Sequence, residues 1–210
     1  LGTAGTGKTT ALKAVLHVLR EESFGFRVAA YTGVAASNVG EGAQTLSSLF
    51  RLNKINEASQ ETEPLPTKPM QEFAKQIQGM RLLVIDEISM VSRVVLAQVS
   101  TRLQEWRAFE GDVANSKLPF GGVGVVLAGD FGQLSPVMEP ANMSLLCPNV
   151  LSSGCRSYTA NLGQRLFRGF TTVVRLRRIH RQPGASDYKE SLLRLRDGAM
   201  SPTHHELWKQ

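Results

Sequence analysis

The chain has 210 residues, with a hydrophobic fraction of 42% and a charged fraction of 20%. This length suits one domain of ordinary size, and this composition excludes a disordered chain. Two cysteines are too few for a disulfide scaffold, and free thiols indicate a reducing compartment. The net charge of +6 favours an anionic partner, but only weakly, since many soluble proteins carry as much.

The distribution of apolar residues and that of basic residues along the chain narrow the class of protein further. No uncharged apolar run reaches the length of a membrane span, so we expect no membrane partner. The basic excess lies wholly within residues 140–186, which contain no acidic residue and no lysine. This Arg-only segment could contact a nucleic-acid backbone, face a second domain or be solvated. Its members are Arg156, Arg165, Arg168, Arg175, Arg177, Arg178 and Arg181.

Helical and strand patterns alternate along the chain. A first helix is predicted from apolar residues at helical spacing, namely Leu12, Val15, Leu16 and Leu19. A second follows from the same spacing at Val91, Val95, Val99, Leu103 and Trp106. Buried strands are predicted at 27–31, 81–85, 123–128 and 171–176. Loops are predicted at 53–69 and 112–122, with a break at 183–186 before a helical pattern at 187–196. The expected fold is α/β, with a mostly parallel sheet and helices on both faces.

The start of the chain carries a phosphate-binding pattern, G-x-x-x-x-G-K-[ST]. Its backbone N–H groups are expected to cradle phosphate oxygens, Lys8 to reach the β- and γ-phosphates, and Thr9 to ligate Mg²⁺. The alternative is a Gly-rich turn that only caps a helix. A phosphate loop normally follows a buried strand, so we expect the sheet to lack its first, central strand. The candidate nucleotide-binding residues are Gly2, Thr3, Ala4, Gly5, Thr6, Gly7, Lys8, Thr9 and Thr10.

Two carboxylates follow the apolar run LLVI. Ligands bind at the carboxyl ends of parallel strands, so Asp86 is expected to hold Mg²⁺ and Glu87 to orient and deprotonate water. The alternative is a helix cap with a first-turn acid. After the next predicted strand comes GDFGQLSPV, in which Gln133 is suited to sensing a γ-phosphate. Further on, Arg181 is expected to contact the same phosphate and stabilise developing charge. Lys8, Glu87, Gln133 and Arg181 are therefore the candidate catalytic residues.

Taken in order, GTAGTGKTT, YTGVAA, TLSSLF, VIDEISMVS, GDFGQLSPV and HRQ resemble the Pif-type (petite integration frequency) DNA helicases of superfamily one. The resemblance covers residues 2 to about 201. It implies a RecA-like motor domain that uses ATP and Mg²⁺ to move 5′ to 3′ on single-stranded or forked DNA. It also implies roles in DNA repair, recombination and telomere maintenance. The implied compartment is intracellular, nuclear if the source is a eukaryote, with the mitochondrion a further possibility.

The same resemblance implies DNA contacts in two further motifs. Hydroxyls of Thr32, Thr45 and Ser48 suit DNA phosphates, and Phe50 suits stacking on a base. Each is also a common cap or core residue. The family pattern is broken at Ser47, where a His is usual, and at Gly132 and Ser135, where Phe and Pro are usual.

We expect residues 1–182 to form the first motor domain, truncated at its N-terminus, and residues 183–210 to form a linker and the start of a second, missing motor domain. On that expectation, the isolated chain would not unwind DNA. The leading hypothesis is an ATP-dependent DNA helicase. The alternatives are another nucleic-acid-dependent P-loop ATPase, such as a RecD-like, RNA-directed or transposon-borne motor, and a relative that binds DNA without turnover. Intact Lys8, Thr9, Asp86 and Glu87 argue against the last.

Overall fold

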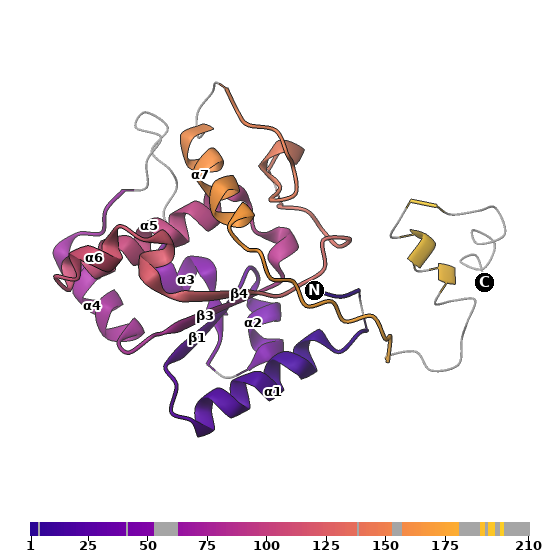
Figure 1. Cartoon of the computed structure of the whole chain (residues 1–210), viewed down its shortest axis with the longest axis horizontal. Coiled ribbons are helices and arrows are strands. Elements are labelled where there is room, and N and C mark those ends of the chain that lie inside the picture. Colours follow the sequence, from indigo (N-terminus) through magenta and orange to yellow (C-terminus); the bar gives the residue numbers. More distant parts are fainter. Residues whose placement is uncertain are drawn as a thin grey trace.

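The structure is a computed structural model that describes residues 1–3, 5–40, 42–52, 63–137, 139–152, 157–180, 190–191, 193–195 and 198–199. Its centre is a parallel sheet with the strand order β2-β1-β3-β4 (Figure 1). The strands are β1 (Phe26–Ala30), β2 (Gln44–Thr45), β3 (Leu82–Asp86) and β4 (Gly124–Leu127). This confirms the predicted α/β class and three of the four predicted strands. All strands point the same way, so their carboxyl ends meet at one edge.

Helices cover both faces of this sheet. On one face, α1 (Lys8–Glu21) and α2 (Gly33–Val39) pack against β1 and β3 through Leu16, Val39 and Val84. The other face carries the larger core, in which Leu83 and Ile85 of β3 meet four helices. These are α3 (Leu46–Phe50), α4 (Thr67–Ile77), α5 (Arg93–Phe109) and α7 (Ser157–Arg168). Figure 1 shows α1 and α5 on opposite sides of the sheet.

The structure corrects the bounds of some of the predicted elements. The loop predicted at 53–69 extends too far, because residues 67–69 belong to the first turn of helix α4, which begins at Thr67. Residues 171–176 were predicted as a strand but form only one bridge, between Leu176 and Gly2. Among the described residues, no strand lies beside residues 171–174 to pair with them. The helix predicted from Leu12, Val15, Leu16 and Leu19 is present as α1, in which Leu12 and Leu16 are buried and Val15 is 53% exposed. The predicted helix at 187–196 lies largely outside the described residues.

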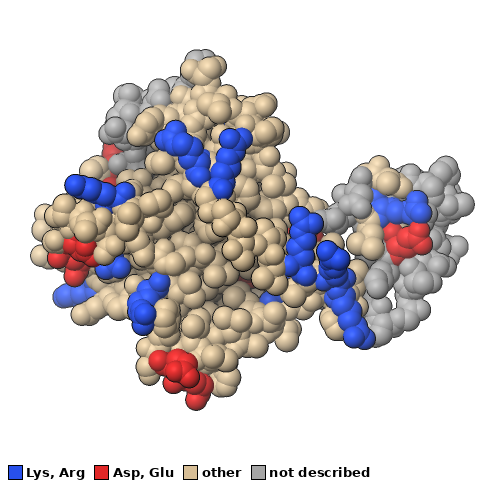
Figure 2. Space-filling model, in the orientation of Figure 1, with Lys and Arg blue, Asp and Glu red and all other residues tan. Residues whose placement is uncertain are grey.

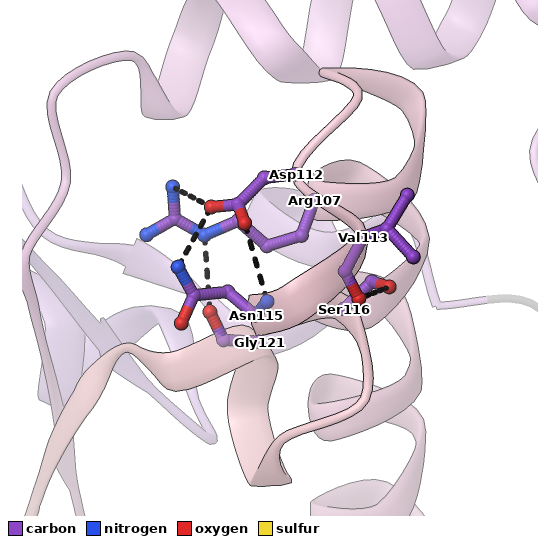
Figure 3. Close-up of polar contacts among 6 residues, drawn as sticks. All are labelled: Arg107, Asp112, Val113, Asn115, Ser116 and Gly121. Atoms are coloured by element: carbon purple, nitrogen blue, oxygen red, sulfur yellow. Dashed lines mark hydrogen bonds and ion pairs between the residues drawn. The ribbon is translucent and has the colours of Figure 1, made fainter.

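The connection from α5 to β4, predicted as a loop, contains the short helices α6 (Val113–Ser116) and η2 (Pro119–Gly122). Asp112 caps α6 by accepting a hydrogen bond of 3.2 Å from the backbone N–H of Asn115 and one of 2.7 Å from its amide (Figure 3). Arg107 of α5 donates to the carbonyl of Gly121 at 3.0 Å and lies 3.8 Å from Asp112. These contacts fasten the connection to α5 and fix where β4 begins.

After β4 the chain forms an irregular segment with the short helix η3 (Ala141–Met143), then α7. The guanidinium of Arg93, which is fully buried, holds this segment by donating to the carbonyls of Ser144, Cys147 and Asn149. A second short helix, η1 (Ile88–Met90), links β3 to α5. None of the described helices combines the length and the apolar character needed to cross a bilayer.

Lys and Arg side chains lie over the α7 region and along the segment that follows it (Figure 2). The exposed arginines there are Arg165, Arg168, Arg175, Arg177 and Arg178. Residues 140–180 contain no acidic residue in the sequence. Arg156 and Arg181 lie outside the described residues, so this surface carries five of the seven arginines of the Arg-only segment.

Candidate nucleotide site

The candidate site lies at the carboxyl edge of the sheet, where β3 ends at Asp86 and β4 ends at Leu127. The phosphate-binding pattern adjoins this edge, because the backbone N–H of Gly2 donates to the carbonyl of Gly129 at 3.2 Å. Three motifs that are far apart in the sequence therefore meet at one end of the sheet. This is the position at which parallel α/β sheets bind their ligands.

The phosphate loop has the backbone that such a cradle requires. Gly5 and Gly7 have φ angles of 79° and 81°, a left-handed conformation that a side chain would strain. The hydroxyl of Thr6, which is buried, donates to the carbonyl of Thr3 at 2.8 Å and holds the turn closed. Lys8 folds back so that its ammonium donates to loop carbonyls at 2.9 and 3.2 Å. The ammonium of Lys8 is therefore held close to the backbone N–H groups of the loop.

Helix α1 starts directly from this loop at Lys8, with Gly7 as its N-cap. Its first intrahelical bond runs from the N–H of Ala11 to the carbonyl of Gly7, at 2.9 Å. The N–H groups of Lys8, Thr9 and Thr10 precede that bond and are available to a ligand. The positive end of a helix of 14 residues adds to the attraction of an anion there. Among the cradle residues, Ala4 lies outside the described residues.

Asp86 and Glu87 face different environments although they are neighbours. Asp86 is only 6% exposed, and its carboxylate accepts the backbone N–H of Glu87 at 2.9 Å. Glu87 has φ 55° and ψ 46°, a left-handed conformation that is uncommon for a residue with a side chain. Burial raises the pKa of Glu87, Asp86 and Asp130 raise it further, and Lys8 opposes the rise. A carboxylate with a raised pKa is better able to accept a proton from water.

The third motif forms a tight turn beyond β4. Asp130 is buried, and its carboxylate accepts the backbone N–H of Gly132 at 3.0 Å, so this residue anchors the turn. The backbone N–H of Gln133 donates to the carbonyl of Asp130 at 3.0 Å. Gln133 itself is exposed at the tip of the turn. The turn is therefore rigid at its base, while Gln133 is free to meet a ligand from solvent.

The segment after α7 also reaches the phosphate loop. Leu176 donates its backbone N–H to the carbonyl of Leu1 at 2.8 Å, and His180 donates to the carbonyl of Gly5 at 2.8 Å. Arg181, the predicted γ-phosphate contact, lies outside the described residues. Sequence reasoning missed the role of His180, because a backbone hydrogen bond leaves no side-chain signature.

The four residues predicted to contact DNA have different environments. Thr32 caps α2 by accepting the N–H of Ala35 at 3.2 Å, and Thr45 caps α3 by accepting the N–H of Ser48 at 3.1 Å. The side chain of Ser48 is exposed, and both threonines are half-buried. Phe50 is 0% exposed, and its ring centroid lies 5.9 Å from that of Phe73. In this structure the prediction that Phe50 stacks on a base is wrong, because its ring belongs to the core.

The oxygen atoms that the protein offers at this site fit a Mg²⁺ ion that is held jointly by protein and nucleotide. Among the described residues, no group of three or more His, Cys, Asp and Glu side chains could hold a metal ion alone. Mg²⁺ bound to nucleotides usually takes one or two protein oxygens and completes its shell with phosphate oxygens and water. The hydroxyl of Thr9 and the buried carboxylate of Asp86 are oxygen donors of that kind.

The chain is a P-loop nucleotide-binding domain. It combines a parallel sheet, a phosphate loop that starts a helix, and a carboxylate pair at the end of β3. The family model "PIF1-like helicase" matches residues 1–206, and the chain belongs to this family. Similar curated proteins are the ATP-dependent DNA helicases Pif1 of a Psychrobacter strain, 35% identical over 136 residues, and PIF1 of Candida albicans, 33% identical over 139 residues. The matches cover 65% and 66% of this chain, but only 19% and 14% of those proteins.

Solved structures give the same assignment of fold. The chain resembles Bacteroides Pif1 bound to ssDNA, with a TM-score of 0.68 and 30% identity over 98% of this chain and 44% of that one. It also resembles Bacteroides Pif1 in complex with ADP-AlF3 and ssDNA, with a TM-score of 0.70 and 28% identity, covering 43% of that chain. The fold is therefore RecA-like, and the chain spans less than half of these solved proteins.

Proposed function

We propose that the chain is a motor domain of an ATP-dependent DNA helicase that translocates 5′ to 3′ on single-stranded or forked DNA. The observation that carries this proposal is the meeting of the phosphate loop, Asp86–Glu87 and the Gly129–Gln133 turn at one edge of the sheet. Binding of nucleotide and ssDNA by the Bacteroides relative supports it. A second RecA-like domain and an intracellular setting, nuclear in a eukaryote, are further parts of the proposal, as are the roles in repair, recombination and telomere maintenance.

On this proposal each candidate site residue has its own role. The loop N–H groups and Lys8 bind the phosphates, and nucleotide entry replaces the loop carbonyls that Lys8 now contacts. Thr9 and Asp86 hold Mg²⁺, which supplies charge neutralisation at the phosphates. Glu87 accepts a proton from the attacking water at its carboxylate. Gln133 and Arg181 contact the γ-phosphate and so report whether it is present.

On the DNA side, the hydroxyls of Thr32, Thr45 and Ser48 are proposed to contact phosphates, which gives binding without sequence preference. The two threonines use their oxygens as acceptors in helix caps, and each retains a hydroxyl proton to donate. Thr32 lies two residues beyond the carboxyl end of β1 and Thr45 is the last residue of β2, so both are at the same edge as the nucleotide site. Movements of the nucleotide site could therefore reach the DNA contacts through the sheet edge.

The first test uses Lys8→Ala and the matched control Lys13→Ala, which changes an exposed lysine on the same helix. We expect Lys8→Ala to weaken Mg²⁺–ATP binding at least about tenfold and to abolish ATP turnover, with little change in Tm, because it removes a charge-assisted phosphate contact. Lys13→Ala should leave both unchanged. Turnover that survives Lys8→Ala would remove the basis of the phosphate-loop assignment.

The second test concerns the hydrolysis step and the direction of translocation along DNA. Glu87→Gln should retain ATP binding and lower turnover by a factor on the order of 10²–10⁴, because the amide cannot accept the proton. For the full-length protein, which includes the second motor domain, we expect unwinding of duplexes with a 5′ single-stranded tail but not of those with a 3′ tail. Preference for the 3′ tail, or turnover that ssDNA does not stimulate, would favour another P-loop ATPase.

A further inference from the structure

Helix α5 carries two arginine side chains that are fully buried. Arg93 and Arg102 have no exposed surface, and each donates to backbone carbonyls of a different part of the chain. They are nine residues apart, which is about two and a half helical turns and places them on opposite sides of the helix. Arg93 holds the segment between β4 and α7, as described above. Arg102 lies on the side of α5 that meets α3.

The guanidinium of Arg102 joins groups that come from separate segments. Its Nε donates to the carbonyl of Phe50 at 3.2 Å, and one terminal nitrogen donates to the carbonyl of Glu63 at 3.3 Å. The other terminal nitrogen lies 2.5 Å from the carboxylate of Glu105, which is on the next turn of α5. Glu105 in turn accepts the backbone N–H of Leu65. One ion pair of α5 therefore holds both the end of α3 and the chain that leads into α4.

Helix α3 depends on contacts of this kind because it is only five residues long. An isolated helix of that length is not stable in water. Its start is capped by Thr45, whereas the carbonyl of Phe50, at its end, has no partner within the helix. The ring of Phe50 lies in the core, and the bond from Arg102 fixes the last turn against α5. Ser48, which is exposed on α3, is thereby held in a defined place.

The ion pair of Arg102 and Glu105 is better suited to fixing geometry than to adding stability. Taking two charges out of water can cost more free energy than their attraction restores, and apolar residues of similar volume are often as stabilising. Burial raises the pKa of Glu105, and Arg102 opposes the rise, so the carboxylate shows this cost. The planar guanidinium, by contrast, sets the directions of several hydrogen bonds at once. What the pair adds is therefore a fixed position for α3.

We propose that Arg102 is a positioning residue for DNA binding, which holds α3 so that Thr45 and Ser48 reach the DNA backbone together. This inference rests on the DNA contacts of the proposed function. Arg102 is buried, so it does not touch DNA and acts through the carbonyl of Phe50. Helix α5 follows Glu87 through η1, so the element that places α3 also begins beside the nucleotide site.

The test uses the full-length protein, a thymine-only ssDNA oligonucleotide and the variant Arg102→Met, which removes the donors and keeps most of the side-chain volume. We expect the Kd for ssDNA to rise at least about tenfold, because misplaced hydroxyls lose hydrogen bonds to charged phosphates. The ssDNA concentration that gives half-maximal ATP turnover should rise by the same factor, whereas turnover at saturating ssDNA should fall less.

The matched control is Arg107→Met, on the same helix. Arg107 also donates to a backbone carbonyl, that of Gly121 at 3.0 Å, but it contacts the connection to β4 and not α3. We expect this variant to lower Tm, because a part-buried carbonyl loses its donor, and to leave the Kd for ssDNA unchanged. A general loss of stability would affect both variants alike.

A second variant separates stability from position at the ion pair itself. Arg102→Met alone leaves the carboxylate of Glu105 without its partner, which also destabilises the protein. Combining it with Glu105→Leu places apolar side chains of similar volume at both positions and should restore most of the Tm. Neither side chain can bond the carbonyl of Phe50, so the Kd for ssDNA should remain raised.

A third variant shows whether Arg102 acts through α3. Ser48→Ala removes an exposed hydroxyl that is proposed to contact DNA and leaves the backbone cap of the helix in place. In the Ser48→Ala protein, Arg102→Met should weaken ssDNA binding less than it does in the parent, because part of the contact that it places is already absent.

Recovery of the parent Kd together with Tm in the double variant, an equal rise of Kd in Arg107→Met, or fully additive effects of Ser48→Ala and Arg102→Met would overturn the inference and leave the proposed function intact. A parent protein that does not bind ssDNA, or an unchanged Kd in Ser48→Ala, would instead overturn the proposed DNA contacts, and the inference with them.

Discussion

The backbone N–H of His180 donates a hydrogen bond of 2.8 Å to the carbonyl oxygen of Gly5, in the centre of the phosphate loop. The two residues are joined across 175 positions of sequence by a bond that involves no side chain. In the sequence His180 immediately precedes Arg181, which is proposed to contact the γ-phosphate.

The first prediction separates this backbone bond from the imidazole. His180→Pro removes the N–H donor, whereas His180→Ala keeps it. We expect His180→Pro to lower ATP turnover about tenfold or more, because catalysis depends on the placement of charged groups at the phosphate. His180→Ala should stay near the parent rate. Steady-state ATP hydrolysis with saturating ssDNA measures both, and equal loss in the two variants would assign the effect to the side chain instead.

The second prediction concerns pH and Glu87. The pKa of Glu87 is raised above 4.5, so the folded state binds its proton more tightly than the unfolded state does. Stability is therefore lost as pH rises from about 4.5 through the folded-state pKa, and the loss persists at neutral pH. We expect Glu87→Gln to increase Tm at pH 7 and to lose this gain below pH 4.5. Thermal melts of both proteins from pH 4 to pH 8 measure the difference, and a gain independent of pH would contradict the electrostatic cause.

Much of this site could be predicted from the sequence because its parts are local. The phosphate loop has its own residue pattern, and the carboxylates after β3 and the turn after β4 each follow an apolar run. The rule that parallel strands end together brings the last two to one edge. Strands buried on both faces are the easiest to find, as β3 shows with four of its five residues buried. The fold class followed from the same pattern.

The rest depended on contacts that the sequence does not encode locally. Phe50 lies in a short helix with two exposed serines, Ser47 and Ser48, yet its ring packs on Phe73 of α4. The start of α4 was missed because it lies in a proline-rich stretch. Residues 171–176 have strand-forming composition, but a strand needs a neighbour, and only Leu1 and Gly2 supply one among the described residues. In both places long-range packing overrides the local pattern.

The third prediction tests the basic surface that follows α7. Replacing Arg175 and Arg177, both exposed, by Gln should reduce the slope of log K against log salt for ssDNA binding by about 1.4, since each phosphate contact contributes about 0.7. The matched control replaces two exposed lysines of α4, Lys68 and Lys75, and should leave the slope unchanged. Binding isotherms at several salt concentrations give the slopes. An unchanged slope in the arginine variant would assign these residues to a domain contact or to solvent.

The fourth prediction concerns the crossing of α7 over α5. A Cβ atom placed on Gly163 would lie 1.8 Å from the carbonyl oxygen of Arg93 and 2.6 Å from its carbonyl carbon, and neither backbone atom can move without shifting α5. Gly163→Ala should therefore cost about 3 kcal/mol and lower Tm by about 6–12 °C. It should also loosen the segment whose carbonyls Arg93 holds, making it more accessible to limited proteolysis. Gly33→Ala, at the start of α2 with no atom within 4 Å of its added methyl, should be neutral or slightly stabilising. Comparable melting of the two variants would show that the α5–α7 crossing tolerates the added methyl and that the close approach at Gly163 does not limit stability.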